Sequence, residues 1–182
     1  MTTTAPVLYL FSSAAPPVFD IAEVIQDAQR HGFDVCLGLT PTAARWLAPR
    51  LPELERLTGH PVRSEYKLPG EPDVWPKAEV VAVAPATFNT LNAWALGITR
   101  EFVVGVVAEG IGKGIPTVTM PCVNAAYVQH RQFERSVAEL RTMGVRVLYG
   151  EGGFEPNQPG QSKPKEYPWR LVLDAAKDLC RP

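Results

Sequence analysis

Short apolar runs alternate with longer amphipathic stretches along the chain, and this alternation constrains the fold more than any other feature. Six runs predict strands: Val7–Ser12, Asp34–Thr40, Pro61–Lys67, Glu79–Ala84, Pro116–Met120 and Val145–Tyr149. Helical spacing fills the intervals, over Val18–His31, Thr42–Ala48, Pro52–Thr58, Thr87–Ile98, Glu101–Gly110, Ala125–Met143 and Trp169–Leu179. Because parallel strands need crossover connections, the pattern predicts an α/β, Rossmann-like parallel sheet of about six strands with helices on both faces.

The size of the chain fits one such sheet. With 182 residues, 46% of them hydrophobic, it can build one sizeable core, so we expect a single domain over residues 1–182. Two stretches resist regular structure: Leu68–Lys77 has three prolines, and Gly150–Pro168 has four glycines and four prolines. Loops of this length are either functional lids or mobile surface segments, and we expect a flexible flap around residues 150–168.

Composition argues against several classes of protein. The net charge of −1, from 18 Lys and Arg against 19 Asp and Glu, gives no support for binding nucleic acid or an anionic membrane. The cysteines Cys36, Cys122 and Cys180 form no CxxC pair, so neither a disulfide framework nor a metal site is expected, and a cytoplasmic location fits. The apolar run Val7–Phe11 is too short to span a bilayer, and no basic residue precedes Arg30 to begin a signal peptide.

Small and hydroxyl residues follow the first two predicted strands. Ser12 and Ser13 end the first strand, and Thr40 ends the second, directly before a predicted helix. Such turns let backbone amides approach a phosphate, and the helix N-terminus adds positive potential. Ser and Thr are also ordinary helix caps, so capping remains an alternative for each residue. The chain contains neither GxGxxG nor GxxxxGK[ST], which favours a mononucleotide over a dinucleotide or P-loop site.

The segment Ala84–Ile98 carries the clearest motif. In it a strand runs into proline, then small and hydroxyl residues, then an amide, then a helix that ends at glycine. It resembles the PASANT signature of the homo-oligomeric flavin-containing cysteine decarboxylases, a family that includes phosphopantothenoylcysteine decarboxylase and the lantibiotic peptide decarboxylases. The matching residues are Pro85, Ala86, Thr87, Asn89 and Thr90.

Two further blocks support the resemblance, which covers roughly residues 7 to 150. Met120–Tyr127 is similar to the P-x-M-N-x-x-M motif of the family, with Pro121 and Asn124 kept. Leu39–Ala44 resembles the T-x-x-A segment of the family. The resemblance implies a flavodoxin-like fold with FMN as cofactor, and an assembly of trimers or multiples of trimers with the flavin between subunits.

The same resemblance implies roles for individual residues. Ser12, Ser13 and Thr40 would contact the FMN phosphate. The flavin or its ribityl chain would be held by the PASANT-like block, that is by Pro85, Ala86, Thr87, Asn89 and Thr90. Asn124 would bind the carboxylate of a substrate, although a loop asparagine that satisfies its own backbone is the alternative.

The chain departs from the family pattern at three places. The histidine that these decarboxylases use before the fourth strand corresponds to Glu71, a carboxylate that is able to act as a base. Arg100 and Glu101 stand where the family has an Asp-Asn pair. The segment Gly150–Pro168 lacks the cysteine that phosphopantothenoylcysteine decarboxylase carries there.

Three hypotheses of function follow. The first is an FMN-binding oxidoreductase or decarboxylase that acts on a small-molecule or peptide carboxylate, with Asn124 and Glu71 as its catalytic residues. The second is a non-enzymatic flavin-fold regulatory or binding subunit, because the family histidine is absent. The third is an α/β domain that binds a nucleotide or sugar phosphate without flavin.

Overall fold

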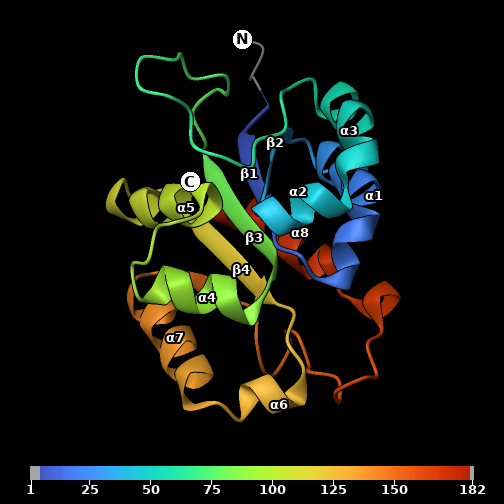
Figure 1. Cartoon of the computed structure of the whole chain (residues 1–182), viewed down its shortest axis with the longest axis vertical. Helices are drawn as coiled ribbons and strands as arrows, with labels where there is room; N and C mark the ends of the chain where they lie inside the picture. Colours follow the sequence, from blue (N-terminus) through green and yellow to red (C-terminus); the bar gives the residue numbers. More distant parts are fainter. Residues whose placement is uncertain (1–4, 181–182) are drawn as a thin grey trace.

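The computed structural model describes residues 5–180 and has one parallel sheet at its centre (Figure 1). The strands lie in the order β2-β1-β3-β4-β5. Their bounds are Val7–Ser12 for β1, Asp34–Leu39 for β2, Val80–Ala86 for β3, Thr117–Pro121 for β4 and Arg146–Val147 for β5. All neighbouring strands pair in parallel. The predicted α/β parallel sheet is therefore confirmed, and it matches the flavodoxin-like strand order.

Helices cover both faces of the sheet. The α-helices are α1 (Ile21–Arg30), α2 (Pro41–Trp46), α3 (Leu51–Thr58), α4 (Phe88–Ala95), α5 (Phe102–Gly112), α6 (Ala125–Val128), α7 (Arg131–Thr142) and α8 (Trp169–Leu179). Short 3-10 turns are η1 (Pro16–Asp20), η2 (Ala48–Arg50) and η3 (Pro164–Glu166). Helix α8 packs on β3 and β4 beside α1, whereas α4 packs against α5 and α7 on the other side (Figure 1).

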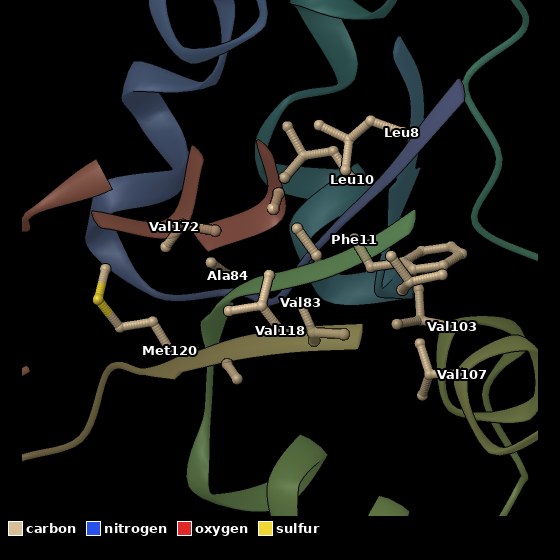
Figure 2. Close-up of a cluster of buried hydrophobic side chains, with 14 of the residues drawn as sticks. Leu8, Leu10, Phe11, Val83, Ala84, Val103, Val107, Val118, Met120 and Val172 are labelled. Carbon is tan, nitrogen blue, oxygen red and sulfur yellow. The ribbon is translucent and has the colours of Figure 1, made fainter. Parts of the chain in front are cut away.

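The core forms where β1 and β3 alternate their side chains between the two helical layers. Leu8 and Leu10 lie on the side of Val172 from α8, and Phe11 points toward Val103 from α5 (Figure 2). All of these side chains are buried. Since both faces of the sheet are covered, its middle strand β3 is apolar throughout, so Val80–Ala86 is a continuous apolar run.

Two sequence predictions differ from the structure. The predicted strand Pro61–Lys67 forms only one bridge, between Arg63 and Gly38, and most of its other residues are polar or exposed. The sheet of the described chain therefore has five strands and not six. The predicted helix Ala125–Met143 is two helices, since His130 has extended backbone angles and its ring Nδ1 accepts a hydrogen bond from the Gln132 amide at 3.1 Å.

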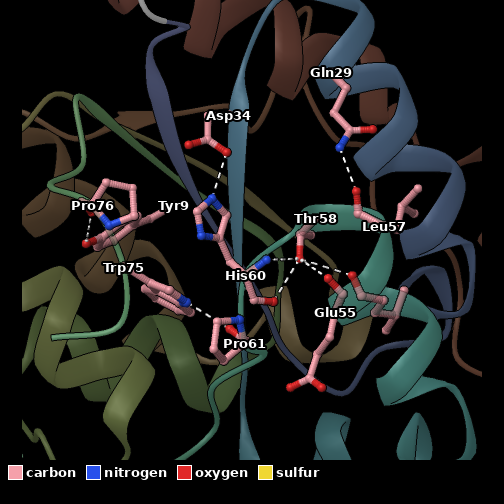
Figure 3. Close-up of polar contacts among 11 residues, drawn as sticks. Tyr9, Gln29, Asp34, Glu55, Leu57, Thr58, His60, Pro61, Trp75 and Pro76 are labelled. Atoms are coloured by element: carbon pink, nitrogen blue, oxygen red, sulfur yellow. Dashed lines mark hydrogen bonds and ion pairs between the residues drawn. The ribbon is translucent and has the colours of Figure 1, made fainter. Parts of the chain in front are cut away.

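Polar contacts fix the segment between α3 and β3 to the amino edge of the sheet (Figure 3). His60 Nε2 lies 2.8 Å from Asp34 Oδ1 at the start of β2. Trp75 Nε1 donates to the Pro61 carbonyl at 2.8 Å, and Tyr9 donates its hydroxyl to the Pro76 carbonyl at 2.6 Å. These contacts hold the two ends of the segment, His60–Pro61 and Trp75–Pro76, to the sheet, whereas Arg63 between them pairs with Gly38 near the end of β2.

Within residues 5–180, every helix is too short or too polar to cross a membrane.

Candidate functional site

A cavity of about 730 Å³ lies at the carboxyl edge of the sheet. In the strand order β2-β1-β3-β4-β5, chain connections leave β1 in opposite directions, and ligands of such sheets bind at this switch point between β1 and β3. The wall comes from the strand ends and from residues 150–168, and it consists of Ala14, Ala15, Pro16, Thr40, Thr42, Thr87, Phe88, Asn89, Thr90, Asn92, Glu101, Cys122, Val123, Asn124, Tyr127, Phe154, Asn157, Gln158, Gly160 and Ser162.

The turns after β1 and β2 lie side by side. The Thr40 amide donates to the Ser12 carbonyl at 3.0 Å, and Thr40 lines the cavity. Ser12 donates its hydroxyl to the Ala84 carbonyl at 2.7 Å, and Ser13 donates its hydroxyl to Thr90 Oγ1 at 2.9 Å. Both serines are buried behind the cavity wall, where Ser12 joins β1 to β3 and Ser13 joins the turn after β1 to α4. The small side chain of Ala14 stands at the surface of the cavity instead.

The PASANT-like block brings three of its predicted residues to the cavity. Thr87 caps α4, because its Oγ1 accepts a hydrogen bond from the Thr90 amide at 3.3 Å. Asn89 is exposed in the first turn of α4, and it lines the cavity together with Thr87 and Thr90. Pro85 and Ala86 are buried in β3, outside the lining residues, and their carbonyls accept from the amides of neighbouring segments.

Asn124 lines the cavity and caps α6 at the same time. Its Oδ1 accepts hydrogen bonds from the Ala126 and Tyr127 amides, both at 3.1 Å. This pairing fixes the orientation of the side-chain amide, and its Nδ2 donor has no partner in the part of the chain that the structure describes. Both interpretations of Asn124 thus have a structural counterpart: one atom satisfies the backbone, and the other is free for a ligand.

Glu71 does not join these residues. It lies in the exposed loop before β3, and its Oε2 accepts a hydrogen bond from the Leu68 amide at 2.8 Å. That loop is at the amino edge of the sheet, the end opposite to the cavity (Figure 1). Within one chain, Glu71 and Asn124 are therefore not brought together.

Most of the lining residues were not assigned to the site from the sequence, and Asn157, Cys122 and Glu101 are three of them. Asn157 reaches the cavity because the 150–168 segment folds back, with the Ala125 amide donating to the Asn157 carbonyl at 2.8 Å. Cys122 follows β4, where burial raises the pKa of its thiol to about 11. Glu101 precedes α5. In the sequence, the only sign of it was that Arg100 and Glu101 replace the Asp-Asn pair of the family motif.

Metal binding has no structural support among residues 5–180, where no group of three or more His, Cys, Asp and Glu side chains is placed to hold an ion.

The strand order and the carboxyl-edge cavity define a flavodoxin-like α/β protein with a small-molecule site at its switch point. The chain belongs to the Flavoprotein family, whose model matches residues 3–176.

One curated relative is the coenzyme A biosynthesis bifunctional protein CoaBC of Thermococcus kodakarensis, which is 26% identical over 160 residues. The match covers 84% of this chain but only 38% of that relative, so this chain corresponds to a minor part of it.

Solved structures show the same fold at low sequence identity. The FMN-dependent cysteine decarboxylase SpaF superposes with a TM-score of 0.73 at 21% identity, covering 98% of this chain and 99% of SpaF. HAL3 from Cryptococcus neoformans superposes with a TM-score of 0.76 at 18% identity, covering 98% of this chain and 97% of HAL3. These similarities confirm the fold that the sequence motifs indicate, and the family-model match over residues 3–176 confirms the family.

Proposed function

We propose that the chain binds FMN in the carboxyl-edge cavity. The observation that carries this proposal is the position of the cavity at the β1/β3 switch point, in a chain of the Flavoprotein family. Its volume of about 730 Å³ falls within the usual range for cofactor and ligand sites. The FMN-dependent enzymes among the structural neighbours favour a mononucleotide over a dinucleotide as the ligand of this cavity.

The turns after β1 and β2 can bind the phosphate of FMN through backbone amides and hydroxyl groups, without a basic side chain. The Ala14 amide has no hydrogen-bond partner within the described residues, and the methyl side chain of Ala14 leaves the backbone open to a ligand. Thr40 adds a hydroxyl from the neighbouring turn. Ser12 and Ser13 would act as positioning residues, because their hydroxyls join β1 to β3 and to α4 behind the phosphate.

The remaining wall suits the flavin and its ribityl chain. Thr87 and Asn89 offer hydroxyl and amide groups from the start of α4. Phe88 and Tyr127 stack with their ring centroids 4.7 Å apart, and both line the cavity. Apolar walls of this kind exclude water from an isoalloxazine ring, while bound FMN would supply a two-electron acceptor for the substrate.

For the reaction, we propose an oxidative decarboxylation of a small or peptide-like carboxylate. Asn124 carries this role, because its Nδ2 donor is unpaired and its orientation is fixed by the two amides that Oδ1 accepts from. A carboxylate bound there would lie against the wall formed by Val123 and Tyr127. Cysteine decarboxylases among the structural neighbours suggest substrates that end in cysteine.

The first experiment is the visible absorbance spectrum of the purified protein, followed by identification of any cofactor released on denaturation. We expect FMN, and we expect Asn89→Ala to weaken FMN binding about three- to tenfold, as for one lost hydrogen bond. Gln26→Ala, an exposed change on α1, is the matched control and should leave FMN affinity unchanged. A colourless protein that fails to take up added FMN would exclude flavin and leave a nucleotide- or sugar-phosphate-binding domain.

A non-enzymatic binding subunit is the second candidate. No histidine is present among the lining residues of the described chain, and Glu71 lies at the other edge of the sheet. Turnover measured on cysteine-terminated peptides separates the two candidates. Carbon dioxide release that Asn124→Ala abolishes supports the enzyme, whereas FMN binding without any release supports the binding subunit.

A further inference from the structure

Glu101 is the one formally charged residue among the described residues that line the carboxyl-edge cavity. The rest of that wall is apolar, hydroxyl or amide in character. A single carboxylate without a compensating base makes this wall unfavourable for an anionic group nearby and favourable for a cationic one.

The backbone of Glu101 is held from two sides. Its carbonyl accepts from the Gly105 amide at 3.0 Å in the first turn of α5, and from the Tyr66 hydroxyl at 3.3 Å. Glu101 occupies the N-cap position of α5, yet its side chain accepts no capping hydrogen bond from the helix. The helix end therefore stabilises a negative charge at this position without using the carboxylate oxygens.

Neither of those oxygens has a hydrogen-bond or ion-pair partner within residues 5–180, and Oε2 is buried as well. Glu101 Oε2 is buried and accepts no hydrogen bond within residues 5–180. None of the ion pairs in this part of the chain includes Glu101. A buried acceptor that stays unpaired is costly, and a buried charged one is more so. A ligand donor that reaches the carboxylate from the cavity is the simplest way to satisfy it, because the side chain lines that cavity although Oε2 itself has almost no exposed surface.

The opposite kind of group stands elsewhere on the same wall. Asn124 presents an unpaired Nδ2 donor after β4, whereas Glu101 presents an unpaired acceptor before α5. A ligand that satisfies both needs an oxyanion at one end and an N–H donor at the other. A primary amine meets the second requirement best, because it adds a positive charge opposite the single carboxylate among the described residues of the cavity wall.

We propose that Glu101 is a specificity-determining residue that accepts a hydrogen bond from a primary ammonium group of the ligand. This assignment rests on the proposed function, since it names the substrate class of the same site. The ligand class is then a small amino acid or peptide with a free amino group and a carboxylate. An N-acylated or purely anionic ligand loses the contact with Glu101.

The test compares two probes on the FMN-loaded protein by calorimetry: alanylalanine, and its N-acetylated form. We expect the wild type to bind alanylalanine at least about tenfold more tightly, as for one charge-assisted hydrogen bond. Glu101→Gln keeps the size of the side chain but removes its charge, and it should bring the ratio close to one. Glu109→Gln is the control, because Glu109 pairs with Lys113 at 2.8 Å on the outer part of α5.

Each outcome decides the proposal. Equal affinity for the two probes in the wild type, or no binding of either, overturns it without needing any variant. A different result is that Glu101→Gln loses FMN affinity while the ratio of the two probe affinities stays unchanged. That result would assign the carboxylate to the flavin and would also overturn the proposal. Failure of the proposed function is seen separately, as a protein without FMN, and the probe ratio remains measurable on that protein.

Discussion

At the scale of single residues, Asn124 divides its two side-chain atoms between structure and ligand. Oδ1 caps α6, and Nδ2 is left for the cavity. Asn124→Asp keeps an oxygen that can cap α6. It replaces the Nδ2 donor with a negatively charged oxygen, which repels the carboxylate of a ligand. We expect its unfolding free energy to stay within about 0.5 kcal/mol of the wild type. Its affinity for a carboxylate ligand should fall at least about tenfold.

Asn124→Ala is the companion variant, because it removes both atoms. It should lose the same affinity and also about 1 kcal/mol of stability, as for a lost helix cap. Urea denaturation and ligand titration of the two variants separate the two roles. Equal ligand affinity in wild type and Asn124→Asp would assign Asn124 to capping alone.

Cys122 gives a prediction that depends on pH. Burial raises the pKa of its thiol to about 11, and only the thiolate is a strong nucleophile. Alkylation of Cys122 by iodoacetamide should therefore be slow at neutral pH and rise about tenfold per pH unit until pH approaches about 11. The difference in labelling between wild type and Cys122→Ser isolates this thiol from Cys36 and Cys180. Rapid labelling at pH 7 would show that the thiol is not desolvated.

At the scale of elements, strands and helices with strong apolar periodicity follow the sequence closely. β1 (Val7–Ser12) and α8 (Trp169–Leu179) have the predicted bounds, because both are anchored by buried side chains. Pro61–Lys67 was wrongly predicted as a strand because its few apolar residues carry no clear alternation. The helix break at His130 involves a hydrogen bond from the Gln132 amide to the His130 ring, and the periodicity of apolar residues does not predict such a bond.

Gly38 in β2 makes the packing between elements testable. A Cβ atom built there would lie 2.3 Å from the Phe11 ring and 3.4 Å from Trp75. Gly38→Ala should therefore cost about 1–3 kcal/mol, because the ring has to move inside a close-packed core. Gly110→Ala on α5 is the matched control, since no atom beyond its chain neighbours and its own helix backbone lies within 4 Å of the added Cβ. Thermal unfolding should show a lower Tm for Gly38→Ala and an unchanged or higher Tm for the control.

At the scale of the whole molecule, the candidate site was predictable where a local motif carries it. Thr40, Thr87, Asn89, Thr90 and Asn124 follow strand ends, and strand ends of a parallel sheet meet at one edge. Asn157 reaches the cavity because the 150–168 segment folds back over it. Glu101 reaches the cavity because α5 packs beside it. These are long-range events that no local pattern specifies. The flexibility of the 150–168 flap stays a prediction.

The position of Glu71 leads to a prediction about assembly. Since the loop that carries Glu71 lies at the amino edge and the cavity at the carboxyl edge, a catalytic role for Glu71 requires a second copy of the chain to present it. The predicted trimer, or multiple of trimers, provides such a copy through a closed head-to-tail contact. Light scattering should then give three times the 19.9 kDa chain mass, or a multiple of that value.

Mixed oligomers connect this assembly to catalysis. Glu71→Gln and Asn124→Ala should each be inactive alone, whereas coexpression of the two should restore about a quarter of the activity. The reason is that random mixing pairs an intact Glu71 with an intact Asn124 at about one interface in four. Coexpression of the wild type with Asn124→Ala is the reference, because it shows how far the two kinds of chain mix within one oligomer. If an oligomer forms but coexpression restores nothing, Glu71 is not supplied to the cavity of a neighbouring copy, and the base must be sought among the lining residues.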